Sequence, residues 1–304
     1  MANITVTEVD AAIPEFWAAT ALGALKANTV MAQLVRRDFD SEVATSGDIV
    51  NVTKRGALSV NDKSANSVVT LQTPSNTKIA ITLDKHKEVS FLIEDAASAK
   101  AIEDALNYVE DAAIVIGEQI DADLLALYGD AGGPVGSASD DMDVPIVVDA
   151  RKALNDTKCP MRGRVFVIGS GPEASLLNKT QFTSSDFGGD VSRVAVIEAN
   201  LGRKYGFDFF MDQQVVETPS PTTVHNIAFH RDAFVLLTRM LPLPPAGSGA
   251  VASTVSEDGV GMRSVRSWNA DHLGMQMTLD LLYGVKALRA DTHAVEVLSS
   301  EATS

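Results

Sequence analysis

The segment KIAITLDKHKEVSFLIE, residues 78–94, alternates between apolar and polar side chains along nearly its whole length. A period of two residues is typical of a half-buried β-strand. As one strand, at about 3.3 Å per residue, the segment would span roughly 55 Å, several times the usual strand length. A strand of this length outruns any compact domain that a chain of this size can form. Its apolar face carries Ile79, Ile81, Leu83, Val89, Phe91 and Ile93, interrupted by Lys85 and Lys87.

A second strand-like stretch, GDIVNVTKRG at residues 47–56, precedes this segment, and polar, turn-rich residues separate the two. Together they predict a long β-hairpin. A lone two-stranded ribbon is marginal in water, and each large apolar side chain contributes roughly 1.5–3 kcal/mol when it is fully buried. We therefore predict that another copy of the chain covers the outer part of the hairpin. The candidate interface residues are Ile79, Ile81, Leu83, Lys85 and Lys87. The two lysines have an alternative role, which is only to keep the ribbon soluble.

Two further regions have helical patterns. Residues 14–35 predict an N-terminal helix or helix pair, in which Trp17 packs either on the chain's own core or on a neighbouring copy. Residues 96–128 contain no proline and space their apolar residues by threes and fours, which predicts a helix of roughly 48 Å. The opposite face of this helix is acidic. Because the helix lacks the histidines of a di-iron bundle, we interpret that face as a solvated surface.

Beyond residue 129 the pattern becomes mixed α/β. Residues 129–143 predict a flexible acidic link, and residues 241–259, rich in Pro, Gly and Ser, predict a surface loop. The remaining predictions are helices at 146–156, 172–178 and 231–240, and strands at 163–169, 207–211, 226–230 and 273–283.

A glycine motif in this half raises the possibility of an enzyme. Gly169, Gly171 and Ala174 follow the apolar run VFVI in the G-x-G-x-x-A pattern of a dinucleotide-binding turn, and Glu198 ends VAVIE where a ribose-binding acid would lie. The context argues against it, because the helix after the motif has barely two turns and VAVIE fits a helix better than a strand. A nicotinamide-dependent oxidoreductase stays as a distant alternative.

Other chemistries find less support. The five histidines share no metal-ligand spacing, Cys159 is the only cysteine, and neither a phosphate loop nor a nucleophile elbow is present. We predict no catalytic, cofactor-binding or metal-binding residues. A net charge of -15 without a Lys/Arg run opposes tight nucleic-acid binding. The sequence has neither a signal-peptide pattern nor a membrane-length apolar run, so we expect no membrane partner and folding in the cytosol.

The order of these segments resembles the major capsid proteins of tailed bacteriophages, which have the HK-97-like fold. Three stretches carry the resemblance: LGRKYGFDFFMDQQV at 201–215, HNIAFHRDAFVLLTR at 225–239 and DLLYGVKALRADTHAVEVL at 280–298. The resemblance covers nearly the whole chain and implies an α+β fold. It also implies a structural protein, not an enzyme, that assembles through pentamers and hexamers into an icosahedral shell around double-stranded DNA.

The resemblance also implies a division of the chain. Residues 1–45 would form an N-terminal arm, and 46–95 an extended loop over a neighbouring subunit. Residues 96–130 would form the spine helix of a peripheral domain, and 131–260 an axial domain. Residues 261–304 would return to the peripheral domain and end in a tail.

The implied partners are further copies of the chain, a portal protein and a decoration protein. A separate scaffolding protein is expected because only about 45 residues precede the hairpin. Contacts with packaged DNA would be weak and non-specific, and the protein would lie in the virion after assembly in the host cytoplasm. Some family members cross-link a hairpin lysine to another subunit, for which Lys63 is a candidate. The alternative within the same fold is an encapsulin-like shell of a bacterial compartment.

Overall fold

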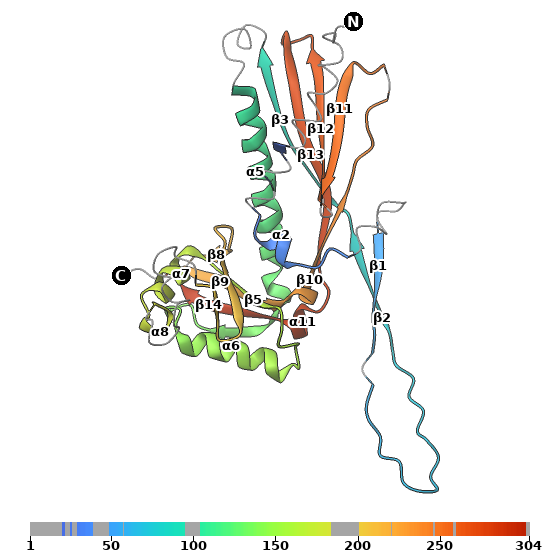
Figure 1. Cartoon of the computed structure of the whole chain (residues 1–304), viewed down its shortest axis with the longest axis vertical. Coiled ribbons are helices and arrows are strands. Elements are labelled where there is room, and N and C mark those ends of the chain that lie inside the picture. Colours follow the sequence, from blue (N-terminus) through green and yellow to red (C-terminus); the bar gives the residue numbers. More distant parts are fainter. Residues whose placement is uncertain are drawn as a thin grey trace, which may run out of the picture.

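The computed structural model describes residues 20–21, 25, 29–38, 49–56, 58–94, 104–183, 201–219, 221–245, 247–257 and 260–301. Figure 1 shows a tall sheet with a long helix beside it, a lobe at the lower end of the helix, and a thin loop that projects away from both. We call the tall sheet the peripheral sheet. The lobe is a second layered unit with its own sheet.

The peripheral sheet has five strands, and β13 (Gly274–Ala287) is the central one. One edge of β13 pairs with β3, and the opposite edge pairs with β12 and then with β10, all antiparallel. β11 extends the sheet beyond β12. The other strands are β3 (Lys85–Glu94), β10 (Phe234–Arg239), β11 (Ala250–Glu257) and β12 (Val260–Asn269).

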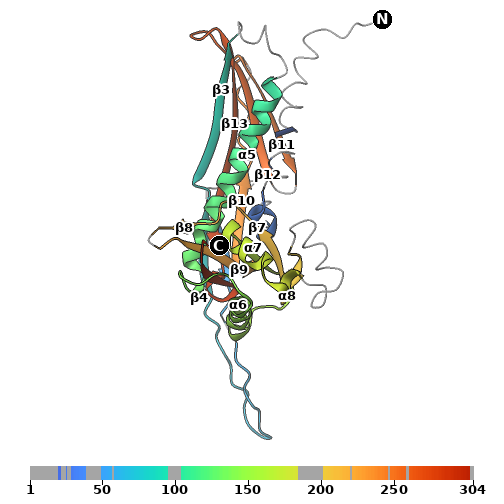
Figure 2. The ribbon, with the colours of Figure 1, turned by 90° about the vertical axis from the view of Figure 1, so that its left-hand side faces the viewer.

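The long helix α5 (Asp104–Leu125) lies along one face of this sheet (Figure 2). Its buried Ile116, Ile120 and Leu124 share a core cluster with Leu279 and Leu281 of β13. The predicted long helix is therefore present. It continues as a 3-10 turn, η1 (Ala126–Asp130), and the residues just before Asp104 lie outside the described part. A short helix, α2 (Met31–Leu34), also packs against α5.

The lobe contains a seven-stranded sheet, most of it in the order β4-β14-β9-β5-β7-β6, with β8 beside β9. One face packs on α6 and α7 through Phe166 and Ile168, while Val165 and Val167 of the same strand join the cluster that contains α5. The strands are β4 (Gly132–Gly136), β5 (Arg164–Ile168), β6 (Arg203–Lys204), β7 (Phe207–Met211), β8 (Glu217–Thr218), β9 (Thr223–His230) and β14 (Ala294–Ser300). The helices are α6 (Val144–Asp156), α7 (Ser170–Leu177), α8 (Thr180–Thr183) and α11 (Ala290–His293).

A two-stranded ribbon, β1 (Ile49–Lys54) with β2 (Thr77–Thr82), leads into the projecting loop. Among residues 55–56 and 58–76 the structure contains no strand, only a turn near Asn66. Gln72 bridges the two arms of the loop by accepting a hydrogen bond from the Ser59 N–H at 2.9 Å. From here on, the name extended loop is kept for residues 58–76, which are the outer part of the segment 46–95.

The predicted continuous strand at 78–94 is wrong in one respect, because it divides at Leu83 and Asp84. Its first half, β2, pairs with β1, whereas its second half, β3, pairs with β13 in the peripheral sheet. Gly284 of β13 permits the crossing, since a Cβ at that position would lie 2.0 Å from the Thr82 carbonyl oxygen. A side chain there would push the two strands apart.

Other sequence predictions also need correction. The helix predicted at 231–240 is a 3-10 turn, η2 (Arg231–Ala233), followed by β10, whose buried FVLLT run has no visible period. The predicted loop at 241–259 contains β11, and the predicted link at 129–143 contains β4.

Sheet membership differs from the predicted division of the chain. β10 and β11 belong to the peripheral sheet although they fall within residues 131–260. β14 belongs to the sheet of the lobe although it falls within residues 261–304. Of the N-terminal arm, α2 and the helical Thr20, Ala21 and Leu25 are described, whereas Trp17 lies outside the described residues.

Candidate functional site

The extended loop exposes large apolar side chains. Val60, Val68 and Leu71 are 90% or more exposed, and Leu58 and Val69 are also exposed. Isolated apolar residues are normal on a protein surface, but several together on one projection mark a contact with another molecule. The extended loop is therefore a candidate interaction surface.

The predicted interface residues of the ribbon, Ile79, Ile81 and Leu83, do not belong to this exposed surface. Ile81 is fully buried, Leu83 is nearly so, and Ile79 packs against the same cluster. The cluster is completed by Val50 of β1, Val235 and Leu237 of β10, and Leu288. These side chains have their partners within this chain. The apolar side chains that a neighbouring subunit could cover lie instead in the extended loop.

The three predicted lysines lie in two different parts of the fold. Lys85 and Lys87 lie in β3 rather than in the ribbon, and the Lys85 ammonium forms an ion pair with Asp123 of α5 at 3.1 Å. Lys63 lies near the tip of the extended loop, where its ammonium donates hydrogen bonds to the Ser64 and Ser67 carbonyl oxygens. Of these three lysines, Lys63 is the one in the projecting loop.

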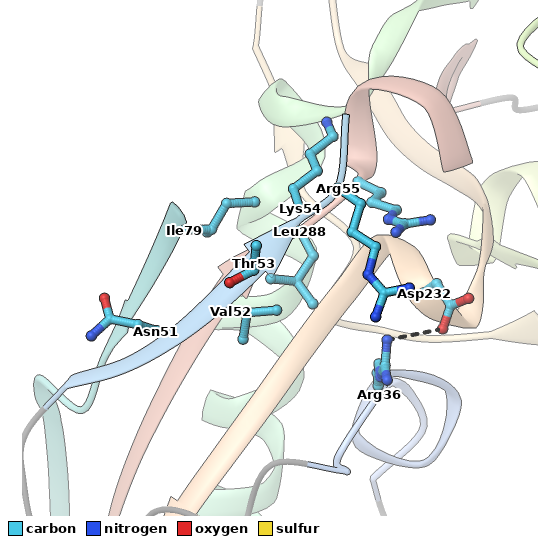
Figure 3. Close-up of a pocket in the computed structure, with 10 residues that line it drawn as sticks. Arg36, Asn51, Val52, Thr53, Lys54, Arg55, Ile79, Asp232 and Leu288 are labelled. Atoms are coloured by element: carbon cyan, nitrogen blue, oxygen red, sulfur yellow. Dashed lines mark ion pairs between the residues drawn. The ribbon is translucent and has the colours of Figure 1, made fainter. Parts of the chain in front are cut away.

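A cavity of about 470 Å³ opens beside the ribbon, near the end that leads into the extended loop, and we call it the loop-base pocket. Four cationic side chains line it together with one carboxylate, Asp232 (Figure 3). The cations are Arg36, Lys54, Arg55 and Arg289. In a chain with an excess of acidic residues, this concentration of positive charge makes a site that can hold anions.

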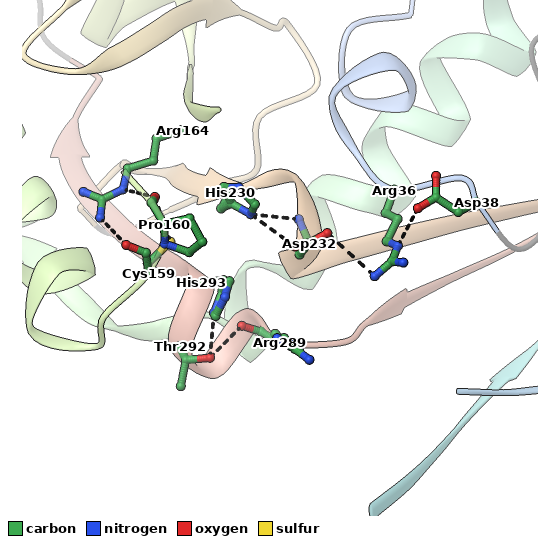
Figure 4. A network of polar contacts seen from close by, with 10 residues as sticks. All are labelled: Arg36, Asp38, Cys159, Pro160, Arg164, His230, Asp232, Arg289, Thr292 and His293. Atoms are coloured by element: carbon green, nitrogen blue, oxygen red, sulfur yellow. Dashed lines mark hydrogen bonds and ion pairs between the residues drawn. The ribbon is translucent and has the colours of Figure 1, made fainter. Parts of the chain in front are cut away.

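Part of that charge is paired within the chain. Arg36 contacts Asp38 at 2.8 Å and Asp232 at 3.7 Å, and Figure 4 shows that Asp232 also lies beside His230. Lys54 pairs with Asp291 at 3.1 Å, outside the pocket lining. These contacts fix the orientation of Arg36 and Lys54, because each side chain is held by at least one carboxylate.

A second polar site joins α2, α5 and the lobe. Asp121 of α5 accepts hydrogen bonds from the Val30 N–H at 2.6 Å and from the Ala32 N–H at 3.1 Å, which holds the start of α2. Burial raises the pKa of Asp121 to about 7 despite these bonds. Asp212, which follows β7, lines a small cavity together with Asp121, and burial raises the pKa of Asp212 as well.

The glycine motif has a packing explanation. Gly171 lies in the first turn of α7, where a Cβ would lie 2.6 Å from the Glu301 carbonyl oxygen. A Cβ on Gly169 would lie 2.9 Å from Val224. The chain just after β14 thus occupies the space beside Gly171, and β9 occupies the space beside Gly169, so each glycine allows one close approach. Glu198 lies outside the described residues.

Two further observations concern the described residues alone. No group of three or more His, Cys, Asp or Glu side chains among them could hold a metal ion. No helix among them is both long and apolar enough to span a membrane.

Comparison with known proteins decides the family. The sequence profile of the phage capsid protein family matches residues 40–238. The chain belongs to this family. No curated protein matches the sequence.

Solved structures agree on the fold of this capsid protein. A structure from Mycobacterium phage Che8 has 21% identity and a TM-score of 0.67, and the match covers 91% of this chain and 92% of that one. The capsid of cyanophage P-SCSP1u has 15% identity and a TM-score of 0.63, with coverage of 91% and 89%. The capsid of a native GTA particle has 11% identity and a TM-score of 0.57, with coverage of 92% and 90%. The HK-97-like α+β fold is confirmed.

The chain is thus a major capsid protein, a structural subunit of an icosahedral shell and a component of the virion. The two alternatives, a compartment shell and an oxidoreductase, are not favoured. Sequence reasoning missed the apolar residues of the extended loop and the loop-base pocket. Two signals could have pointed to them: the valines and leucines within a polar turn region, and the Lys54-Arg55 pair in an acidic chain.

Proposed function

We propose that this capsid protein forms pentamers and hexamers in which the extended loop of each subunit lies on a neighbouring subunit. The observation that carries the proposal is the exposure of Leu58, Val60, Val68, Val69 and Leu71 on one projection. Each such side chain contributes roughly 1.5–3 kcal/mol on full burial. Part of that gain is offset because the loop loses conformational freedom when it docks.

Repetition makes modest contacts sufficient. A contact between different surfaces of identical subunits closes into a ring when the rotation between subunits allows it. A subunit held by several neighbours binds far more tightly than one contact would suggest, because the later contacts form within an existing assembly. The loop therefore supplies one of several contacts that together hold the shell.

The remaining partners are part of the same proposal. The shell encloses double-stranded DNA and contacts it weakly, which the net charge of -15 supports since phosphate binding needs clustered cations. A separate scaffolding protein, a portal protein and a decoration protein complete the expected partners. Assembly in the host cytoplasm belongs to this proposal too.

The test compares two double variants of the extended loop. Val60→Ser with Leu71→Ser removes two of its most exposed apolar side chains, while Asn61→Ser with Thr70→Ser changes two exposed polar residues in the same loop. Subunit folding is measured by circular dichroism, and shells are counted by negative-stain microscopy and sedimentation.

We expect the apolar double variant to keep the wild-type fold and to lose at least tenfold in shell yield. The polar double variant should assemble like the wild type. Wild-type yields from both variants would contradict a docking role for the loop. Failure of the wild-type chain to form any shell, with or without a scaffolding protein, would contradict the proposed assembly as a whole.

A further inference from the structure

We infer that the loop-base pocket binds carboxylate side chains of a second copy of this chain in the assembled shell. The inference rests on the proposed assembly and adds to it a contact of different chemistry from the apolar loop. The pocket draws its charge from separate parts of the chain: Arg36 after α2, Lys54 and Arg55 at the end of β1, and Arg289 between β13 and α11. Folding thus concentrates cations that the sequence keeps apart.

The positive charge of the pocket exceeds what the chain itself neutralises. Among the described residues that line it, Asp232 is the one carboxylate, and it contacts Arg36. Within the described residues, neither Arg55 nor Arg289 takes part in an ion pair, and both side chains are exposed. Two guanidinium groups are therefore available, each of which can bind a carboxylate through two parallel hydrogen bonds.

The apolar side chains that line the pocket favour such pairs. Val52, Ile79 and Leu288 line it beside the cations. A carboxylate that enters displaces water from an apolar surface, and an ion pair that is partly removed from water is stronger than a fully exposed one.

The chemistry of the pocket fits a protein carboxylate better than nucleic acid. A duplex needs a continuous cationic surface that follows its phosphates, whereas this cavity measures about 470 Å³ and contains Asp232. The chain itself carries 40 Asp and Glu against 25 Lys and Arg, so the surface of another copy is rich in the required ligand. Charge complementarity thus selects a second subunit as the occupant.

The position of the pocket agrees with this occupant. Residues 51–55 and Ile79, which line it, belong to the ribbon that continues directly into the extended loop. A subunit that covers the apolar loop therefore lies next to the pocket. The two contacts would then form together, with the apolar one supplying affinity and the charged one fixing the orientation.

The first test reverses charge at the two unpaired arginines. Arg55→Glu with Arg289→Glu is compared with Lys152→Glu and Arg162→Glu, two exposed cations of the lobe whose reversal changes the net charge equally. We expect the pocket variant to fold like the wild type and to lose at least tenfold in shell yield, while the lobe variant assembles normally. Wild-type yield from the pocket variant would overturn the inference and leave the proposed role of the extended loop intact.

The second test reads the contact directly by carbodiimide coupling of Lys54 to carboxylates in shells assembled from light and isotope-labelled subunits. Lys54 lies 3.1 Å from Asp291 of its own chain, which provides a same-label cross-link as an internal control. We expect additional mixed-label cross-links from Lys54 that are present in shells, absent from free subunits, and lost from any particles of the pocket variant.

Cross-links from Lys54 that carry the same label throughout would overturn the inference. So would protection of Lys54 that appears only in DNA-filled shells and not in empty ones, because the occupant would then be nucleic acid. An inability of the wild-type chain to assemble under any condition contradicts the proposed function instead, so the two failures are distinguishable.

Discussion

The hairpin has an inner half, the ribbon of β1 and β2, and an outer half, the extended loop. The two halves contain the same kinds of residue in opposite surroundings. In the inner half, Ile81 is fully buried and Val50 nearly so, against β10 and Leu288. In the outer half, Val60 is 97% exposed and Leu71 is 90% exposed. Apolar content alone therefore does not decide which part of a hairpin belongs to an interface. What decides is whether the chain itself supplies a covering surface.

The difference separates two contributions to the shell. The inner half stabilises the subunit, because its side chains complete a core cluster of the chain. The outer half contributes little to the subunit and is available for a neighbour. Variants in the two halves should accordingly affect different measurements: subunit unfolding for the inner half and assembly for the outer half.

The largest expected effect is a loss of subunit stability caused by a change in the inner half of the hairpin. Ile81→Ala removes a fully buried side chain, and such a truncation costs about 2–5 kcal/mol of unfolding free energy. Val60→Ala, its matched control in the extended loop, should change that free energy by less than about 0.5 kcal/mol. Urea unfolding of free subunits measures both. Equal effects of the two variants would contradict the comparison.

The next effect concerns the crossing that divides the ribbon from the peripheral sheet. Gly284→Ala places a Cβ 2.0 Å from the Thr82 carbonyl oxygen, and the required backbone shift should cost roughly 1–3 kcal/mol or more. Gly133→Ala is the control, since its Cβ meets no atom within 4 Å. Thermal unfolding compares the pair. A Gly284→Ala subunit as stable as the control would mean that the crossing is not closely packed.

A smaller effect is expected at the start of β3. Lys85→Glu replaces the ammonium that pairs with Asp123 by a second carboxylate, which should cost about 1–2 kcal/mol, less than a fully buried pair would. Lys87→Glu, two residues further along, should change stability by less than about 0.5 kcal/mol. Because the sequence makes both lysines candidates for an interface, the alternative outcome is that Lys85→Glu combined with Lys87→Glu leaves the subunit folded and disturbs assembly. If this double variant unfolds like the wild type but fails to assemble, at least one of the two lysines contacts another subunit, and the ion pair of Lys85 with Asp123 contributes little to subunit stability.

The most gradual expected effect is a pH dependence of stability in the body of the molecule, spread over about three pH units. The pKa of Asp121 is raised from 3.8 to about 7 in the folded chain, so folding favours the neutral carboxyl. Its contribution is complete below pH 4 and is lost as the pH rises towards 7, with a slope of at most about 1.4 kcal/mol per pH unit. Asp121→Asn does not titrate. The stability advantage of the wild type over this variant should therefore shrink from pH 4.5 to pH 7.5 in urea unfolding, and an advantage that grows would contradict the assignment.

How far the sequence could predict this fold depends on where the determining contacts lie. The alternation at 78–94 and the three- and four-residue spacing along α5 are local, so the pattern predicts both elements. The division at Leu83 is not local. The alternation continues across it, and Gly284, which permits it, lies about 200 residues away in the chain.

The other features that the sequence did not predict also depend on contacts between distant parts of the chain. β10 has side chains buried on both faces, which removes the period that distinguishes a strand from a helix. The loop-base pocket combines Arg36, Lys54, Arg55 and Arg289 only after β1 and β13 have taken their places. The apolar residues of the extended loop were visible in the sequence, but their exposure depends on the absence of a covering element among the described residues.

Hydrogen exchange of the amides of residues 58–71 tests the central claim most directly. It should be measured by mass spectrometry on free subunits and on assembled shells, with β13 as the protected reference in both. We predict fast exchange in the free subunit and strong protection in the shell, because only a second copy covers this loop. Equal exchange in the two states, or a loop that is already protected in the free subunit, would contradict the account.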